Sequence, residues 1–406
     1  TNNQLFSIDI IFKRTKLGET LALFSAGTGT SAEFRVFIDT SDNLQVEHVG
    51  GSGTFDYTTT QVFRDPAAYN NLRIDVDMSQ AAADRVILKL QGTRITDFIS
   101  ANNPSSAFDT FVNTTNPHYI GVRADGSTNQ GKYYISRFLL TDGNTAADTG
   151  ELTDDGFWQI NDASELTFGT NGFLIEGGSA MAAGTDSSGN SNNFSKTGSI
   201  ISTSDSPTNS DDGYGNYATP SPIDKQSNIT LANGNTSFTS SNSQNGRCTF
   251  KIAADDTTKY YWECDVTTQA NTLHFGFTDA DNGLTAVTSG NNFLVVYSGS
   301  STNWDAYQNN SSLTSSILTG VSNGDTIMYA FDPISRKIWV GVDNTWSGDP
   351  VAGTGEAATL AASSAGWLPF YRVGSTSAGS YNFGATAFTH TQPSGFVTLA
   401  TQNLPT

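Results

Sequence analysis

The stretch that most constrains the fold is residues 323–346, where two runs of alternating apolar residues flank a proline. Large apolar side chains occupy every second position in 327–331 and again in 338–342. A period of two places these side chains on one face of a strand. Pro333 has no backbone N–H to donate, so it belongs to the turn between the two strands. The sequence predicts a β-hairpin, and because two strands alone are only marginally stable, its apolar face must pack against another sheet.

Both halves of the chain repeat this pattern of short apolar segments separated by turn residues. In the first half the candidate strands are 6–12, 21–24, 34–38, 44–46, 72–76, 86–90, 119–122 and 133–140. In the second half they are 250–252, 260–266, 273–277, 293–296, 327–331, 338–342, 368–371 and 381–383. No helical periodicity extends beyond two turns. Regularly spaced strands with turns between them predict an all-β chain made of two antiparallel β-sandwiches in series.

A polar segment in the middle of the chain predicts the domain boundaries. Residues 202–222 consist mainly of Ser, Asp, Asn, Gly and Pro, which is typical of a connector. We therefore expect a first domain at 1–150, a connector at 151–222 and a second domain at 223–406. Within the connector, Phe173–Ile175 is apolar enough to pair with the first sandwich. Tyr214 and Tyr217 are candidates for anchoring the connector to a neighbouring subunit.

The charge balance narrows the choice of partners. The chain has 39 acidic and 20 basic residues and a net charge of −19. Such a surface repels nucleic acid and anionic lipid, so neither is expected as a partner. No apolar run approaches the roughly 20 residues that a membrane helix needs. The first residues contain no basic segment followed by an apolar one, so we expect no signal peptide within this sequence.

Cys248 and Cys264 are the two cysteines of the chain. A hairpin formed by residues 247–252 and 259–266 would bring them near each other across two strands. A disulfide then depends on the directions of the two Cβ atoms, which the sequence does not fix. Two buried free thiols are the alternative.

In the first half, the order of four motifs resembles a known domain type. The motifs are Thr59–Tyr69, Arg85–Gly92, Pro117–Gly121 and Lys132–Gly143. Together they are similar to the concanavalin A-like, laminin-G-like domains of tailed-phage virion proteins. The resemblance spans most of residues 1–145 and continues into Thr185–Phe194.

In the second half, six short motifs occur in the order found in SPRY domains. They are Lys259–Glu263, His274–Thr278, Gly324–Asp325, Lys337–Gly341, Trp367–Phe370 and Asn382–Gly384. The resemblance covers nearly all of residues 245–390. Residues 388–405 are in addition similar to the ends of SPRY-bearing phage structural proteins.

These resemblances imply a non-enzymatic structural protein of a bacteriophage virion. It would be a tail fibre, appendage or capsid decoration protein exposed on the extracellular surface of the particle. The implied partners are other virion proteins and a host-surface glycan. The implied state is a homo-oligomer, with a trimer as the form expected of a fibre. The alternative is a secreted bacterial adhesin or carbohydrate-binding protein, which would require a precursor with a signal peptide.

The sequence does not contain the acidic motif of related polysaccharide-cleaving enzymes. Those relatives use Glu-x-Asp-x-x-Glu on one strand, which aims the carboxylates into a cleft. The nearest match here is Glu263-Cys264-Asp265, but Thr268 stands in the third position. We therefore expect no catalytic residues. If Glu263 were catalytic after all, Glu263→Gln would abolish release of reducing ends from a polysaccharide.

Two acidic residues suggest a cation site. Asp279 and Asp281 lie in Asp-Ala-Asp-Asn-Gly, which resembles half of a calcium loop but lacks the glutamate that an EF-hand requires. Calcium ligation and an ordinary polar turn both remain open. No other cofactor is expected, because none of the four histidines stands at metal-ligand spacing from another histidine or a cysteine.

Three aromatic residues are the candidate ligand-binding residues. Trp304, Tyr307 and Trp346 occur in polar, loop-like sequence, where an exposed ring can stack on the face of a sugar. The alternative is that these rings fill the open ends of a sandwich core.

Overall fold

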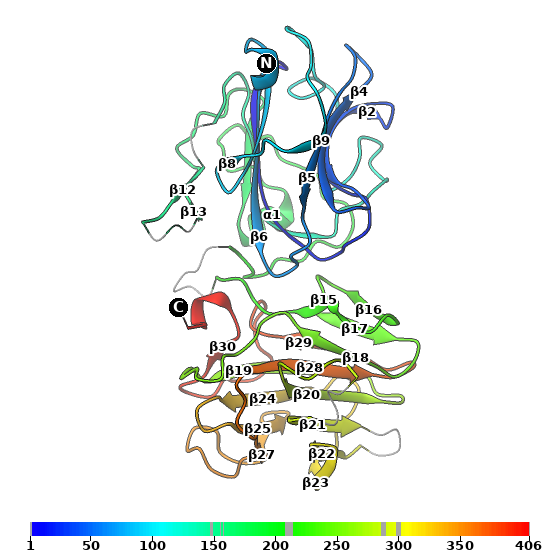
Figure 1. The fold of residues 1–406 in the computed structure, drawn as a ribbon, viewed down its shortest axis with the longest axis vertical. Coiled ribbons are helices and arrows are strands. Elements are labelled where there is room, and N and C mark those ends of the chain that lie inside the picture. Colours follow the sequence, from blue (N-terminus) through cyan, green and yellow to red (C-terminus); the bar gives the residue numbers. More distant parts are fainter. Residues whose placement is uncertain are drawn as a thin grey trace. The chain divides into compact units, whose positions relative to one another are not determined.

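The computed structural model describes residues 2–146, 149–154, 156, 158–207, 214–285, 290–297 and 302–405. The chain forms two compact units, Thr1–Thr203 and Ser204–Thr406. Each unit contains two large sheets, which we call A and B in the N-terminal unit and C and D in the C-terminal unit (Figure 1). No helix of the described part is long and apolar enough to cross a membrane.

The N-terminal unit has two six-stranded sheets. Sheet A has the order β14 (Phe173–Glu176), β11 (Tyr133–Leu140), β1 (Leu5–Arg14), β6 (Tyr69–Asp77), β7 (Val86–Leu90) and β8 (Thr93–Arg94). Sheet B has the order β10 (His118–Ile120), β2 (Leu21–Gly29), β3 (Ala32–Ile38), β4 (Asn43–Val49), β5 (Phe55–Val62) and β9 (Phe98–Asn102). The smaller elements are η1 (Ala82–Asp84), the hairpin β12 (Gly150–Leu152) and β13 (Trp158–Ile160), and α1 (Gly178–Ala183).

The core of this unit lies between sheets A and B. Alternate residues of β1 and β3 point inward, as the period of two predicts, and Phe6 meets Phe34 edge to face with ring centroids 5.9 Å apart. The predicted pairing of Phe173–Ile175 with the first sandwich is also present, because β14 pairs with β11. The compact unit therefore extends to residue 203, and residues 151–203 of the expected connector belong to it.

The C-terminal unit has one seven-stranded and one nine-stranded sheet. Sheet C has the order β15 (Pro220–Lys225), β18 (Gln244–Cys248), β28 (Trp367–Val373), β20 (Leu273–Asp279), β21 (Asn292–Tyr297), β22 (Trp304–Gln308) and β23 (Ser311–Leu318). Sheet D has the order β16 (Ile229–Ala232), β17 (Ser237–Ser240), β29 (Ala378–Asn382), β19 (Tyr260–Thr268), β24 (Thr326–Asp332), β25 (Lys337–Val342) and β26 (Thr345–Trp346). β27 (Ala358–Thr359) pairs with β25, β30 (Val397–Thr398) pairs with β19, and η2 (Thr401–Asn403) follows.

Aromatic side chains join sheets C and D. Trp262 of β19 stacks on Phe277 of β20, with centroids 5.6 Å apart and an interplanar angle of 25°. The hydroxyl of Tyr329 donates a hydrogen bond of 2.8 Å from sheet D to the carbonyl oxygen of Phe275 in sheet C. The predicted hairpin is confirmed, because β24 and β25 pair from Ile327–Val342 to Asp332–Lys337. All-β architecture with two antiparallel sandwiches is thus what the chain forms.

Some predicted strands require correction. Residues 250–252 form no strand among the described residues, and Ile252 makes only an isolated bridge to Trp367. β22 and β23 were not predicted, because these strands are largely polar and carry little apolar alternation. The expected hairpin around the cysteines is wrong as well. Cys248 lies in sheet C and Cys264 lies in sheet D, where both are buried free thiols whose pKa burial raises.

Two histidines of the N-terminal unit are held in the neutral form. His48 is fully buried and stacks against Phe111, with centroids 4.8 Å apart. His118 accepts the backbone N–H of Asn113 at Nε2 (3.1 Å), so the proton of the ring must sit on Nδ1, which contacts the carbonyl oxygen of Asn116 (2.8 Å). Burial lowers the pKa of both imidazoles, and their hydrogen bonds to carbonyl oxygens offset this only in part.

We predict that the N-terminal unit loses stability as pH falls below about 6.5, where histidines of the unfolded chain bind protons. The folded-state pKa of His48 and of His118 is lowered, so protons bind the unfolded chain first. The stability contributed by the two neutral histidines is fully present above that pH, and it is lost as the pH falls toward their folded-state pKa. Urea unfolding, followed by hydrogen-exchange mass spectrometry of peptides from residues 32–63 at about pH 7.5 and 5.5, measures this loss. The variant His48→Phe should show a smaller loss, and an unchanged unfolding midpoint in the native chain would contradict the prediction.

Candidate functional site

The outer face of sheet C collects polar side chains that have unused hydrogen-bonding atoms. Phe275 and Phe277 of β20 point into the core, so His274, Gly276 and Thr278 point outward. The strand register continues this outward set onto both neighbouring strands. Five cross-strand neighbours follow one another across the sheet: Asn245, Arg372, His274, Val296 and Asp305. We call the four polar residues among them, all except Val296, the polar row.

Several buried atoms on this face have no hydrogen-bond partner in the described part of the chain. They are Oδ1 of Asn245, Nε of Arg372, Nδ1 of His274 and, further along β21, Nδ2 of Asn292. Buried polar groups are nearly always hydrogen-bonded, so four such atoms on one face indicate a place that a polar ligand or water completes. Burial, followed by the Arg372 guanidinium, lowers the pKa of His274 to about 3, so its imidazole is neutral.

A small apolar patch borders the polar row. Phe370 and Leu294 are almost fully buried although they point away from the core, and Val296 and Tyr307 pack against them half-buried. Gly276 lies between Phe370 and Leu294, and a Cβ there would come within 2.9 Å of both side chains. Absence of a side chain at Gly276 therefore allows the two large residues to meet across β20. The face thus combines an apolar surface with polar groups, which is the composition of many ligand-binding surfaces.

The segment after β20 folds back over one side of this face. Nη1 of Arg247 donates to the carbonyl oxygens of Ala280 (3.1 Å) and Asn282 (2.6 Å), and Nδ2 of Asn245 donates to that of Leu284 (2.8 Å). Arg247 also forms an ion pair of 2.7 Å with Asp224. These contacts hold residues 280–284 over β18.

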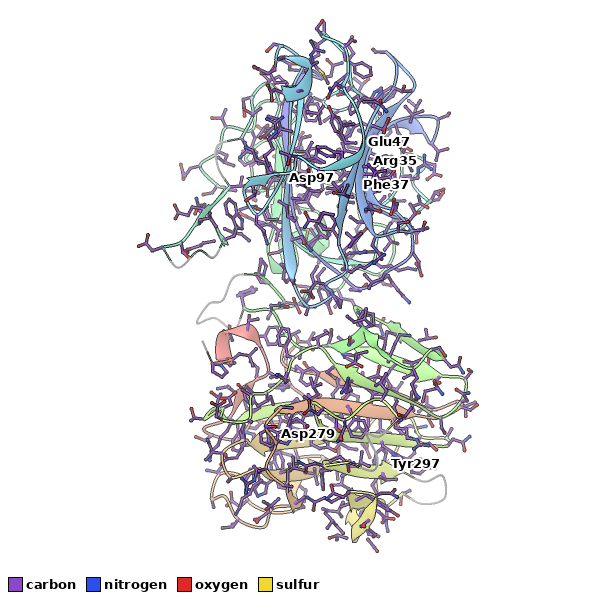
Figure 2. All side chains as sticks on the ribbon, viewed as in Figure 1. Arg35, Phe37, Glu47, Asp97, Asp279 and Tyr297 are labelled. Carbon is purple, nitrogen blue, oxygen red and sulfur yellow. The ribbon has the colours of Figure 1, made fainter. Side chains whose placement is uncertain are left out.

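The two predicted metal ligands lie at the start of this segment, where Figure 2 labels Asp279. Oδ1 of Asp279 accepts the backbone N–H of Asp281 at 3.0 Å, which is the hydrogen bond of a polar turn. No group of three or more His, Cys, Asp or Glu side chains in the described residues could hold a metal ion. Asp279 and Asp281 thus lie in a polar turn, and calcium ligation by this pair stays a prediction.

The three predicted aromatic contact residues do not form one site. Trp304 is in strand β22 rather than a loop, and it is fully buried against Phe275, with centroids 6.0 Å apart. Tyr307 lies on the outer face of sheet C. Trp346 lies half-buried on the outer face of sheet D, where it packs near Tyr261. Trp304 is therefore a core residue, and Tyr307 and Trp346 lie on opposite sides of the sandwich.

On the outer face of sheet B, the charged groups already neutralise one another. Arg35 and Glu47 form an ion pair, and the Arg35 guanidinium lies 3.9 Å from the ring centroid of Phe37 (Figure 2). Glu33 is fully buried beside them and pairs with Arg123. Arg35, Glu47 and Glu33 thus each have an opposite partner, so none of these three groups is open for a ligand.

The carboxylates that were considered for catalysis are engaged in structural hydrogen bonds. Glu263 is buried and accepts the Tyr261 hydroxyl and two backbone N–H groups, those of Thr389 and His390, each at 2.8 Å. Asp75 of β6 is likewise paired, with Arg73 (2.7 Å) and Lys89 (3.2 Å). Glu263 thus fixes the segment that follows β29 onto sheet D.

The sequence did not single out Arg372, Asn245 or Asn292 as site residues. Their only signal was a polar residue at an outward position of an otherwise apolar strand, such as Arg372 between Tyr371 and Val373. Outward polar residues are common in half-exposed strands, so that signal is weak.

Of the comparisons with known proteins, those with solved structures give matches. No family model matches the chain, and no curated protein matches it. Three similar solved structures are the TRIM65 PSpry domain (12% identity, TM-score 0.33), a human SPRY domain (11%, 0.30) and the SPRY domain of human HERC1 (17%, 0.28). These cover 41%, 40% and 40% of this chain and 92%, 98% and 96% of the respective structures.

We predict that two substitutions in β22 lower stability by very different amounts. Trp304→Ala removes a fully buried ring and should lower the free energy of unfolding by about 3–5 kcal/mol. Tyr307→Ala removes a half-buried ring from the outer face and should cost less than about 1.5 kcal/mol. Urea unfolding followed by the fluorescence of the remaining tryptophans measures both. Equal losses would contradict the assignment of the two residues to opposite faces.

Proposed function

We propose that this chain is a non-enzymatic structural protein of a phage virion, an exposed fibre, appendage or decoration protein. In this proposal it attaches the particle to a host-surface glycan through the outer face of sheet C. The observation that carries the proposal is the apolar patch beside the polar row, with its buried atoms that have no partner within the described residues. Sugars bind in this manner, through ring packing together with hydrogen bonds to hydroxyl groups.

Two further observations support a binding role rather than catalysis. Glu263, the nearest match to a catalytic acid, accepts three hydrogen bonds, two of which hold the C-terminal segment. Asp265, two residues further along β19, accepts the hydroxyls of Thr326 (2.9 Å) and Ser380 (2.8 Å). A general acid or base has to reach the scissile bond of a substrate, and these carboxylates are occupied by the protein itself.

The virion assignment rests on the resemblance of the sequence motifs to phage structural proteins. It includes contacts with other virion proteins and assembly with further copies of this chain, a trimer in the case of a fibre. The alternative, a secreted bacterial adhesin or carbohydrate-binding protein, would use the same face in a different location. Mass spectrometry of purified virions separates the two, since the chain should be present in particles only in the first case.

We predict that Tyr307→Ala weakens attachment to host cells by about tenfold, because a ring that packs on a sugar contributes an amount of this order. The matched control is Tyr119→Ala, which removes a half-buried tyrosine of β10 in the N-terminal unit, outside the proposed face. Binding of the fluorescently labelled chain to host cells, and to glycans released from them, measures both variants. Equal affinity of the Tyr307→Ala and native chains would remove the face from the proposal, and release of reducing ends would contradict a non-enzymatic role.

A further inference from the structure

Arg372 differs from every other arginine of the chain. The other arginines, all within the described residues, each donate at least one hydrogen bond to a carboxylate or a carbonyl oxygen. The Arg372 side chain has no hydrogen bond or ion pair with any described residue, and its Nε is buried without a partner. A guanidinium is always charged, so this charge lacks the compensation that buried or half-buried charges normally receive.

In the described strands, no carboxylate lies directly beside Arg372. Its neighbours in the polar row are the amide of Asn245 on β18 and the neutral imidazole of His274 on β20. The acid of that row is Asp305, three strands away, or about 14 Å at the usual strand spacing. Asp305 moreover accepts the backbone N–H of Ser316 at 2.8 Å.

The nearby charges on the other side of the row are also occupied. Asp224 forms two hydrogen bonds with Arg247, at 2.7 and 3.1 Å. Arg85 and Arg336 also lack an acidic partner in the described structure, but each donates to a carbonyl oxygen, whereas the Arg372 guanidinium donates to neither. An anion from outside would supply the missing charge, and it would also meet the unused buried atoms beside it.

The shape of the group indicates which anion fits. One guanidinium presents two parallel N–H donors that match the two oxygens of a planar carboxylate. Phosphate carries more charge and usually requires further cations, and no second arginine without a hydrogen-bond partner occurs among the described residues. The Asn245 amide and the His274 imidazole lie on either side and can bond to hydroxyl groups next to the carboxylate.

We propose that Arg372 binds the carboxylate of an acidic sugar and thereby makes this face selective for uronic-acid-containing glycans over neutral ones. The choice of a sugar as the bearer of the carboxylate rests on the proposed function. Val296 and Tyr307 lie further along the same face and provide apolar surface for the adjoining part of a glycan.

The test is titration of the full chain with sodium glucuronate, with glucose as the neutral probe and sodium sulfate as the probe for a nonspecific anion. Binding is followed by the NMR signal of the Arg372 Nε–H and by isothermal titration calorimetry. For the native chain, glucuronate should shift that signal and should bind at least about tenfold more tightly than glucose or sulfate.

Three variants separate the roles of charge and geometry. Arg372→Gln should lose about tenfold in glucuronate affinity, and Arg372→Lys, which keeps the charge without the two-donor fork, should lose an intermediate amount. Lys251→Gln is the matched control, because it removes one positive charge from an exposed residue and should leave the affinity unchanged. A native circular dichroism spectrum of each variant establishes that it is folded.

The results for the acidic sugar and for host attachment can be told apart. Unchanged glucuronate affinity in Arg372→Gln, or sulfate binding equal to that of glucuronate, would overturn the inference. If Arg372→Gln also binds host glycans like the native chain while Tyr307→Ala does not, the inference fails and the proposed function stands. If glucuronate binds through Arg372 and no host glycan binds, the carboxylate site stands and the proposed function fails.

Discussion

The aromatic layer between sheets C and D is the interaction on which the C-terminal unit depends. Trp262 stacks on Phe277 and Tyr329, and the Tyr329 hydroxyl reaches the backbone of the opposite sheet. These contacts fix which residues of β20 point inward. Since strand side chains alternate, the same contacts also determine which residues point outward. His274 therefore lies on the outer face of sheet C, beside Arg372. The composition of the binding face follows from the packing of the core.

Buried and half-buried charged side chains differ in whether they have an oppositely charged partner. In the N-terminal unit, buried acids such as Asp9 and Glu33 have arginine partners, Arg137 and Arg123 respectively. Removing one member of such a pair leaves an uncompensated buried charge, so these pairs belong to the structure. On sheet C, Arg247 is also paired, with Asp224. Arg372 has no such pair among the described residues, and this contrast separates a group that could recognise a ligand from groups that hold the fold together.

The sequence predicted much of the fold, because alternation of large apolar residues is a local property. The hairpin of β24 and β25 could be identified from residues 327–342 alone. The sequence did not place Trp304 and Tyr307 correctly, because β22 has too few apolar residues to be recognised as a strand. Their spacing of three puts them on opposite faces once the strand is known. Arg372 could not be recognised at all, because the lack of a partner depends on strands that are far apart in the sequence.

Both faces of β19 and β24 are buried, so sheet D needs a cover on its outer side as well as the core on its inner side. Phe388 and Phe396 pack on Tyr261 and Trp339, and the Glu263 carboxylate binds the intervening backbone. Within the C-terminal unit, this cover is synthesised after the strands that it shields. The N-terminal unit can complete its fold while synthesis continues, since domains generally fold as units. The C-terminal unit cannot shield the outer side of sheet D until translation has passed residue 396, so the rings of Tyr261 and Trp339 are uncovered in its nascent form.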